Sequence, residues 1–135
     1  MKLRIKGNSI RLRLGQSEVK RLATTGAVEE STLFGPSPAH RFVYALRAAS
    51  GEHDGAIASF AGRSLVISLP QSEIHQWAST EQVAIVAIQQ TGDDTQLRIL
   101  IEKDFECIEA SPEESQEDAY PHPQFGIPCA AGKQN

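Results

Sequence analysis

The chain has 135 residues, of which 40% are hydrophobic and 22% are charged, and its formal net charge at pH 7 is −4. This length suits one domain with a single core, and the acidic balance argues against a general nucleic-acid-binding protein, which carries an excess of Lys and Arg. Two cysteines are too few for a disulfide scaffold.

The charges are distributed unevenly along the chain. Residues 1–21 contain seven Lys or Arg and one Glu, whereas residues 102–118 contain eight Asp or Glu and one Lys. Such an asymmetry indicates either an interaction tail or mutual neutralisation of the two segments.

The N-terminal residues do not have the pattern of a secretory signal. Alternation of polar and apolar residues begins at Lys2 without an apolar stretch of about 7–15 residues. The longest wholly apolar run, residues 83–88, is far shorter than the roughly 20 residues of a membrane-spanning helix. We therefore expect a cytoplasmic protein that makes no membrane contact.

The first predicted element is a β-hairpin. Residues 2–6 and 9–14 alternate between basic or polar and aliphatic side chains, as strands with one buried face do, and Gly7-Asn8 suits a two-residue turn. In that register the inner face is wholly aliphatic. Five basic residues then share the outer face, namely Lys2, Arg4, Lys6, Arg11 and Arg13.

A short helix is predicted next, over residues 16–25, because Val19 and Leu22 lie about one turn apart and Glu18 falls in the first turn. Gly26 ends it at the position where a left-handed residue is common. Two strands follow, over about 27–33 and 41–48, joined by a turn-rich segment.

The second half of the chain repeats this pattern at an offset of 55. Residues 9–28 align without gaps on residues 64–83, with eight of the twenty positions identical. The alignment predicts a second helix over residues 71–80, with Pro70 at its start and Trp77 in the core. Strands are expected over about 82–89 and 97–105.

The predicted fold class is α+β. A duplicated β-β-α-β-β unit, with copies over about 1–49 and 56–105, gives about eight mostly antiparallel strands and two short helices in one domain, residues 1–109. We expect the strands to form a barrel or half-barrel, because closure leaves few exposed edges; an open sheet with both helices on one face is the alternative. Residues 110–135 are an acidic, Pro-rich tail, which can dock through Tyr120, Phe125 and Ile127.

The basic face of the first hairpin is the candidate ligand-binding site. Five Lys or Arg side chains on one pleated face can bind a phosphorylated or acidic small molecule or an acidic protein segment, with the arginines binding bidentately. The alternative is a solvated face paired with acids such as Glu29, Glu102 or Asp104. The equivalent face of the second hairpin is uncharged, since it carries Ile57, Ser59, Ser64, Val66 and Ser68.

No catalytic, metal or cofactor site is predicted. The ligand-type residues have no spacing typical of a metal site; they are His40, His53, His75, His122, Cys107 and Cys129. The sequence also contains no nucleophile elbow, phosphate-binding loop or dinucleotide fingerprint.

The hairpin of residues 1–14 and the Glu102-Lys-Asp-Phe105 strand are similar to those of a family of small bacterial proteins of unknown function. The resemblance covers roughly residues 1–123 and implies no activity. A weaker resemblance is to the triphosphate tunnel metalloenzymes. Those enzymes begin with Glu-x-Glu-x-Lys, where this chain has Lys2-x-Arg4-x-Lys6, so the metal-binding carboxylates are missing.

These observations favour a non-enzymatic binding or interaction module that uses the basic hairpin face for an acidic ligand or partner. The alternative is a phosphohydrolase or phosphate-transfer enzyme of the tunnel type. Convergence of the five cations on an enclosed cavity would favour the enzyme, and an outward-facing arrangement would favour a surface contact.

Overall fold

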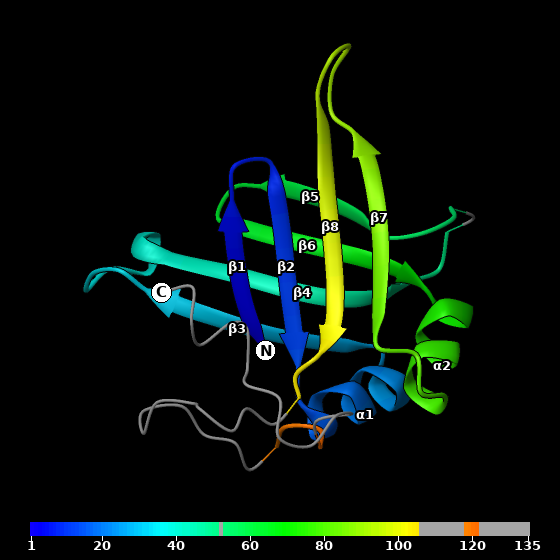
Figure 1. Ribbon diagram of the computed structural model, residues 1–135. Coiled ribbons are helices and arrows are strands. Elements are labelled where there is room, and N and C mark those ends of the chain that lie inside the picture. The colour runs from blue at the N-terminus through cyan, green and yellow to red at the C-terminus, as the bar shows by residue number, and fades with distance from the viewer. Residues whose placement is uncertain (52, 106–117, 122–135) are drawn as a thin grey trace.

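The computed structural model of the chain describes residues 1–51, 53–105 and 118–121. In these ranges the order of strands and α-helices is β-β-α-β-β, twice, and the eight strands form two four-stranded sheets (Figure 1). No helix in the described part of the chain is long and apolar enough to cross a membrane. The predicted α+β class is confirmed.

The first sheet, here called sheet A, lies in front in Figure 1. Its outer hairpins are antiparallel, and its two central strands, β2 and β8, run parallel. The strands in sheet order are β1 (Lys2–Lys6), β2 (Ser9–Leu14), β8 (Gln96–Lys103) and β7 (Ala84–Gln90). Gly7, with φ of 52°, occupies the first position of the β1–β2 turn, where glycine avoids a steric clash.

The second sheet, here called sheet B, crosses behind sheet A (Figure 1). It has the same plan, with a parallel central pair, β4 and β6, between antiparallel hairpins. The strands in sheet order are β3 (Ala27–Leu33), β4 (Arg41–Ala49), β6 (Ser64–Pro70) and β5 (Ile57–Ala61). A short 3₁₀ turn, Pro38–His40, precedes β4.

Two short helices close one corner between the sheets, α1 (Gln16–Thr25) and α2 (Gln71–Ser79), and they contact each other (Figure 1). Gly26 ends α1 with φ of 86°, as predicted, and its amide donates a hydrogen bond to the Leu22 carbonyl. Pro70 immediately precedes α2. The predicted helix boundaries are therefore confirmed to within one residue.

The core lies between the two sheets and the two helices. Strands β2, β6 and β8 bury alternate aliphatic residues, β4 buries Ala45 and Leu46, and each helix buries two side chains, Val19 and Leu22 in α1 and Ile74 and Trp77 in α2. Trp77 is fully buried, as predicted, and its indole Nε1 donates to the Val83 carbonyl at 3.0 Å. Burial of these apolar side chains is the main stabilising contribution.

The prediction of a barrel or half-barrel is wrong, because the strands form two separate sheets. Closure would require backbone pairing where the edges of the two sheets meet. At the corner of β5 and β7 a side chain takes that role: the Gln89 amide accepts from the Ala58 N–H at 2.7 Å and donates to the Ala58 carbonyl at 2.9 Å. The alternative of one open sheet is also wrong.

The two halves of the chain are interleaved. Each sheet combines the first hairpin of one half with the second hairpin of the other half. Several pairings correspond at the offset of 55, since Ile10 pairs with Ile99 in sheet A and Leu65 pairs with Tyr44 in sheet B. The strands directly after the helices, β3 and β7, do not follow this offset, because Val28 pairs with Leu46 whereas Ile85 pairs with Ile101.

Candidate functional site

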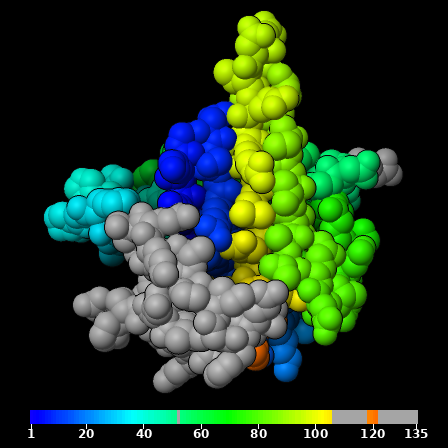
Figure 2. Space-filling view, in the orientation of Figure 1, coloured from blue at the N-terminus to red at the C-terminus, as the bar shows by residue number. Residues whose placement is uncertain are grey.

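The basic face is the solvent-facing side of β1 and β2. The pairing register is the predicted one, with Lys2 opposite Arg13 and Arg4 opposite Arg11. The alternate residues of β2, Ile10, Leu12 and Leu14, are buried. The five predicted site residues therefore lie together on the outer face of sheet A, which Figure 2 shows from the front.

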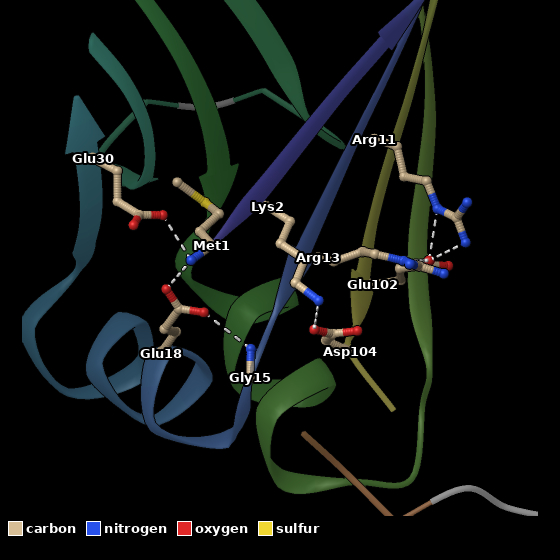
Figure 3. A network of polar contacts seen from close by, with 9 residues as sticks. All are labelled: Met1, Lys2, Arg11, Arg13, Gly15, Glu18, Glu30, Glu102 and Asp104. Atoms are coloured by element: carbon tan, nitrogen blue, oxygen red, sulfur yellow. Dashed lines mark hydrogen bonds and ion pairs between the residues drawn. The ribbon is translucent and has the colours of Figure 1, made fainter. Parts of the chain in front are cut away.

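Parallel pairing of β2 with β8 brings acids to the lower half of this face. Arg13 lies opposite Glu102, and one Glu102 oxygen, Oε1, accepts from Nε of Arg11 at 2.7 Å and from Nε of Arg13 at 2.9 Å (Figure 3). Lys2 Nζ lies 3.0 Å from Oδ2 of Asp104. Three of the five predicted cations are thus paired with carboxylates.

Two of the three acids proposed as partners are confirmed. Glu102 and Asp104 pair with the hairpin, but Glu29 lies on sheet B and pairs there with Arg47 at 3.1 Å. The expectation for Glu29 fails because β3 and β1 belong to different sheets. The acids between residues 106 and 117 lie outside the described residues.

The upper half of the face, which we call the basic groove, contains cations without a carboxylate. A shallow groove of about 170 Å³ is lined by Arg4, Lys6, Ser9, Ile10, Arg11, Arg98 and Leu100. Among the described residues, no ion pair involves Arg4, Lys6 or Arg98. This half of the face therefore has three cations without a carboxylate partner in the described part of the chain.

Arg98 was not among the site residues predicted from the sequence. It reaches the groove because β8 pairs in parallel with β2, which places Arg98 opposite Ser9. Its alternation with the buried Ile99 indicated an outward position, but nothing in the sequence identified β2 as the neighbour of β8.

An apolar strip borders the basic groove. Leu100 lines the groove, and on β7 the outward Val86 and Ile88 are 54% and 55% exposed. The register places Val86 opposite Leu100 and Ile88 opposite Arg98. The outer face of sheet A therefore presents cations and aliphatic side chains next to each other, and its strands contain no aromatic residue.

Met1, which precedes β1, is anchored at the opposite end from the basic groove. The Met1 amine pairs with Glu18 of α1 and lies 2.7 Å from Oε2 of Glu30 on β3 (Figure 3). Glu18 also accepts from the Gly15 amide, and the Tyr44 hydroxyl donates to the Met1 carbonyl. Burial, with smaller effects from Glu30 and Glu18, raises the pKa of Tyr44 above its usual 10.0.

Residues 118–121 return to the bottom of sheet A and the start of α1. Phe105 and Tyr120 form an isolated β-bridge. Tyr120 lies beneath the buried Lys103, whose Nζ is 5.3 Å from the ring centroid and donates to the Thr80 carbonyl. Burial lowers the pKa of Lys103 and raises that of Tyr120. The predicted contact through Tyr120 is present, whereas Phe125 and Ile127 lie outside the described residues.

The ligand-type residues do not gather into a metal site within the described part of the chain, where no group of three or more His, Cys, Asp or Glu is placed to hold an ion. His53 Nδ1 lies 3.1 Å from the Gly55 carbonyl, and His75 contacts Gln71 within α2. His122, Cys107 and Cys129 lie outside the described residues.

Comparison with known proteins gives a family but no activity. No curated protein and no solved structure matches the chain. The resemblance to the triphosphate tunnel metalloenzymes thus gains no support. One family model matches residues 1–124, and its description is a family of unknown function. This match agrees with the resemblance drawn from the N-terminal hairpin and the Glu102–Phe105 strand, and the chain belongs to the family of unknown function DUF7009.

Proposed function

We propose that the protein is a binding module that holds an acidic or phosphorylated group of a ligand or partner on the outer face of sheet A. The observation that carries the proposal is the division of the basic face into two halves. Lys2, Arg11 and Arg13 have carboxylate partners, whereas Arg4, Lys6 and Arg98 surround a groove and have none among the described residues.

Like charges gathered on one surface favour an external anion. The side chains of Arg4 and Arg11 are directly opposite on neighbouring strands, and like charges in such a pair destabilise a sheet. A bound carboxylate or phosphate group relieves this repulsion and accepts charge-assisted hydrogen bonds, bidentate ones from arginine. The arginine side chains therefore contribute more to the stability of the protein with a bound anion than to that of the free protein.

The arrangement supports binding rather than the tunnel-type reaction. The cations lie on an open sheet face, while the space between the sheets is filled by aliphatic side chains. Glu102 and Asp104, the described carboxylates that contact the basic face, are each paired with Arg or Lys. Metal-assisted phosphate transfer needs carboxylates that are free to coordinate the ion.

We also propose that the two halves of the chain arose by duplication of one β-β-α-β-β unit. The two copies together form one domain, residues 1–109. The repeated order of elements and the pairings that correspond at the offset of 55 support this origin. Only the first half evolved the basic outer face, since the outer face of β5 and β6 has no charged residue.

The proposal is tested by ligand-dependent stabilisation. Unfolding of the full chain is followed with pyrophosphate, triphosphate and hexaglutamate, each with and without Mg²⁺. A ligand at 100 times its dissociation constant is expected to stabilise the protein by about 2.7 kcal/mol, and Mg²⁺ should not be required. If none of these anions stabilises the protein, the proposal is contradicted. Mg²⁺-dependent hydrolysis of triphosphate would favour the enzyme instead.

A further inference from the structure

The free edge of sheet A is the second feature of the basic face. Among the described residues, β1 pairs on one side only, with β2, and its outward side chains Lys2, Arg4 and Lys6 stand in a row along the opposite edge. In an antiparallel hairpin with a two-residue turn, alternate residues direct their backbone groups to the partner strand. Lys6, next to the turn, directs its N–H and C=O groups to β2. By alternation, Arg4 and Lys2 direct their backbone groups to β2 as well.

The intervening residues of β1, Leu3 and Ile5, therefore direct their N–H and C=O groups to the free edge. Within the described part of the chain, neither residue makes a hydrogen bond on that side. Unpaired backbone groups along a strand edge are a template for another strand. An extended peptide segment that pairs there would continue sheet A.

The space beside β1 on its inner side is apolar and incompletely covered. Ile5 faces the same side as the buried Ile10, but is 59% exposed. Figure 1 shows that β3 and β4 continue beyond β1, so that sheet A ends before sheet B does. Phe42, the second residue of β4, is only partly buried. An added strand would cover these apolar side chains with its own.

We propose that the partner of the basic face is an acidic protein segment that adds to β1 as an extended strand, with carboxylates alternating with apolar residues. This inference rests on the proposed function. Side chains on one face of a strand repeat every second residue, about 6.8 Å apart, so outward carboxylates of the segment match Arg4 and Lys6, while Lys2 at the end of the row already pairs with Asp104. Inward apolar residues of the segment meet Ile5 and Phe42.

The composition of the face favours this partner over a single-stranded nucleic acid. Proteins that bind single strands stack bases on aromatic side chains, and the outer face of sheet A has none. Cations along an edge also repel a second copy of the same edge, so that the charge selects an acidic segment and prevents pairing between copies.

The inference is tested by amide hydrogen exchange of the full chain, measured by NMR, with the blocked peptide Glu-Val-Glu-Val-Glu-Val-Glu as the probe. At a peptide concentration about ten times its dissociation constant, exchange of the Leu3 and Ile5 amides should slow by about tenfold, because only the free protein exchanges. A peptide of the same composition with its acids and valines in separate blocks should give weaker binding and no such protection.

Two N-methylated forms of the alternating peptide provide the matched control. Methylation of either every Glu amide or every Val amide removes the donors on one edge of the peptide only. One form should lose binding and the other should retain it, and the form that fails identifies the direction of the added strand. Equal binding of both forms would overturn strand addition.

The remaining outcomes separate this inference from the proposed function. If both peptide sequences bind equally and the Leu3 and Ile5 amides stay unprotected, the face binds anions but does not add a strand. Stabilisation by triphosphate without binding of either peptide would likewise show that the face binds anions but does not add a strand. Protection of both amides in the free protein would show that the edge is already paired and overturn the inference. If no anionic probe binds, both the proposed function and this inference are wrong.

Discussion

Glu102 controls how much positive charge the basic face presents. Its side chain is 15% exposed, and its Oε1 contacts both Arg11 and Arg13, so that one negative charge offsets half of the positive charge of the two arginines. Such partly buried, charge-assisted hydrogen bonds contribute more to stability than exposed ion pairs do. The same residue therefore stabilises the folded protein and weakens the attraction of the face for anions.

Replacement of Glu102 by Gln should change stability and binding in opposite directions. We expect Glu102→Gln to lower the free energy of unfolding by about 1 kcal/mol and to tighten the binding of hexaglutamate or triphosphate, since two arginines are released. Urea denaturation and calorimetric titration measure the two effects. The matched control is Glu29→Gln, which breaks the exposed pair with Arg47 and should cost less than about 0.5 kcal/mol without affecting binding.

Weaker anion binding by the Glu102→Gln protein, or the same binding as the Glu29→Gln protein, would contradict this role.

At the scale of single residues the sequence predicted most of the basic face, because alternation alone placed five cations on one side of the hairpin. It did not reveal Arg98, whose position depends on which strand lies beside β2.

The N-cap residue of helix α1, Gly15, has no side chain that could accept from the first amides of the helix. Asp118, distant in sequence, supplies the cap. Its Oδ1 accepts from the Ser17 amide at 2.9 Å, its Oδ2 accepts from the Ser17 hydroxyl at 2.7 Å, and its carbonyl accepts from the Gln16 amide at 2.8 Å. A carboxylate at this end also interacts favourably with the helix dipole.

Removal of the Asp118 carboxylate should therefore weaken α1. We expect Asp118→Ala to lower the free energy of unfolding by about 1 kcal/mol and to accelerate exchange of the Ser17 amide. The control is Asp94→Ala, at an exposed position in the turn between β7 and β8, which should leave both measurements unchanged. Unchanged Ser17 exchange in the Asp118→Ala protein would show that the cap does not stabilise the helix.

Elements were predictable where local sequence determines them. Period-two alternation gave the strands, and Gly26 gave the end of α1. The pairing of strands from different halves was not predictable, since parallel neighbours such as β2 and β8 are separated by most of the chain and no local pattern specifies their contact. The cap by Asp118 was missed for the same reason.

For the whole molecule, the sequence predicted the class and the number of strands but not the closure. Eight strands with two helices are compatible with a barrel or with two crossed sheets, and the choice depends on what meets at the corners. Here α1 and α2 fill one corner and the Gln89 side chain bridges another. These side-chain contacts replace the backbone ladder that a barrel would need.

The net charge of −4 and the basic groove together define the electrostatics of the molecule. An acidic protein repels anions at a distance, so only a local concentration of cations can hold one. Binding at the groove should therefore depend on the positions of the cations rather than on total charge.

Calorimetric titration of two triple variants with triphosphate and hexaglutamate tests this claim directly. One variant combines Arg4→Gln, Lys6→Gln and Arg98→Gln; the other combines Lys20→Gln, Arg21→Gln and Arg41→Gln, at exposed positions away from the groove. Both remove three positive charges. We predict that the groove variant binds about tenfold more weakly or worse, a loss of about 1.4 kcal/mol, while the control retains wild-type affinity. Equal affinity of the two variants, or no binding to the wild-type protein, would contradict the account.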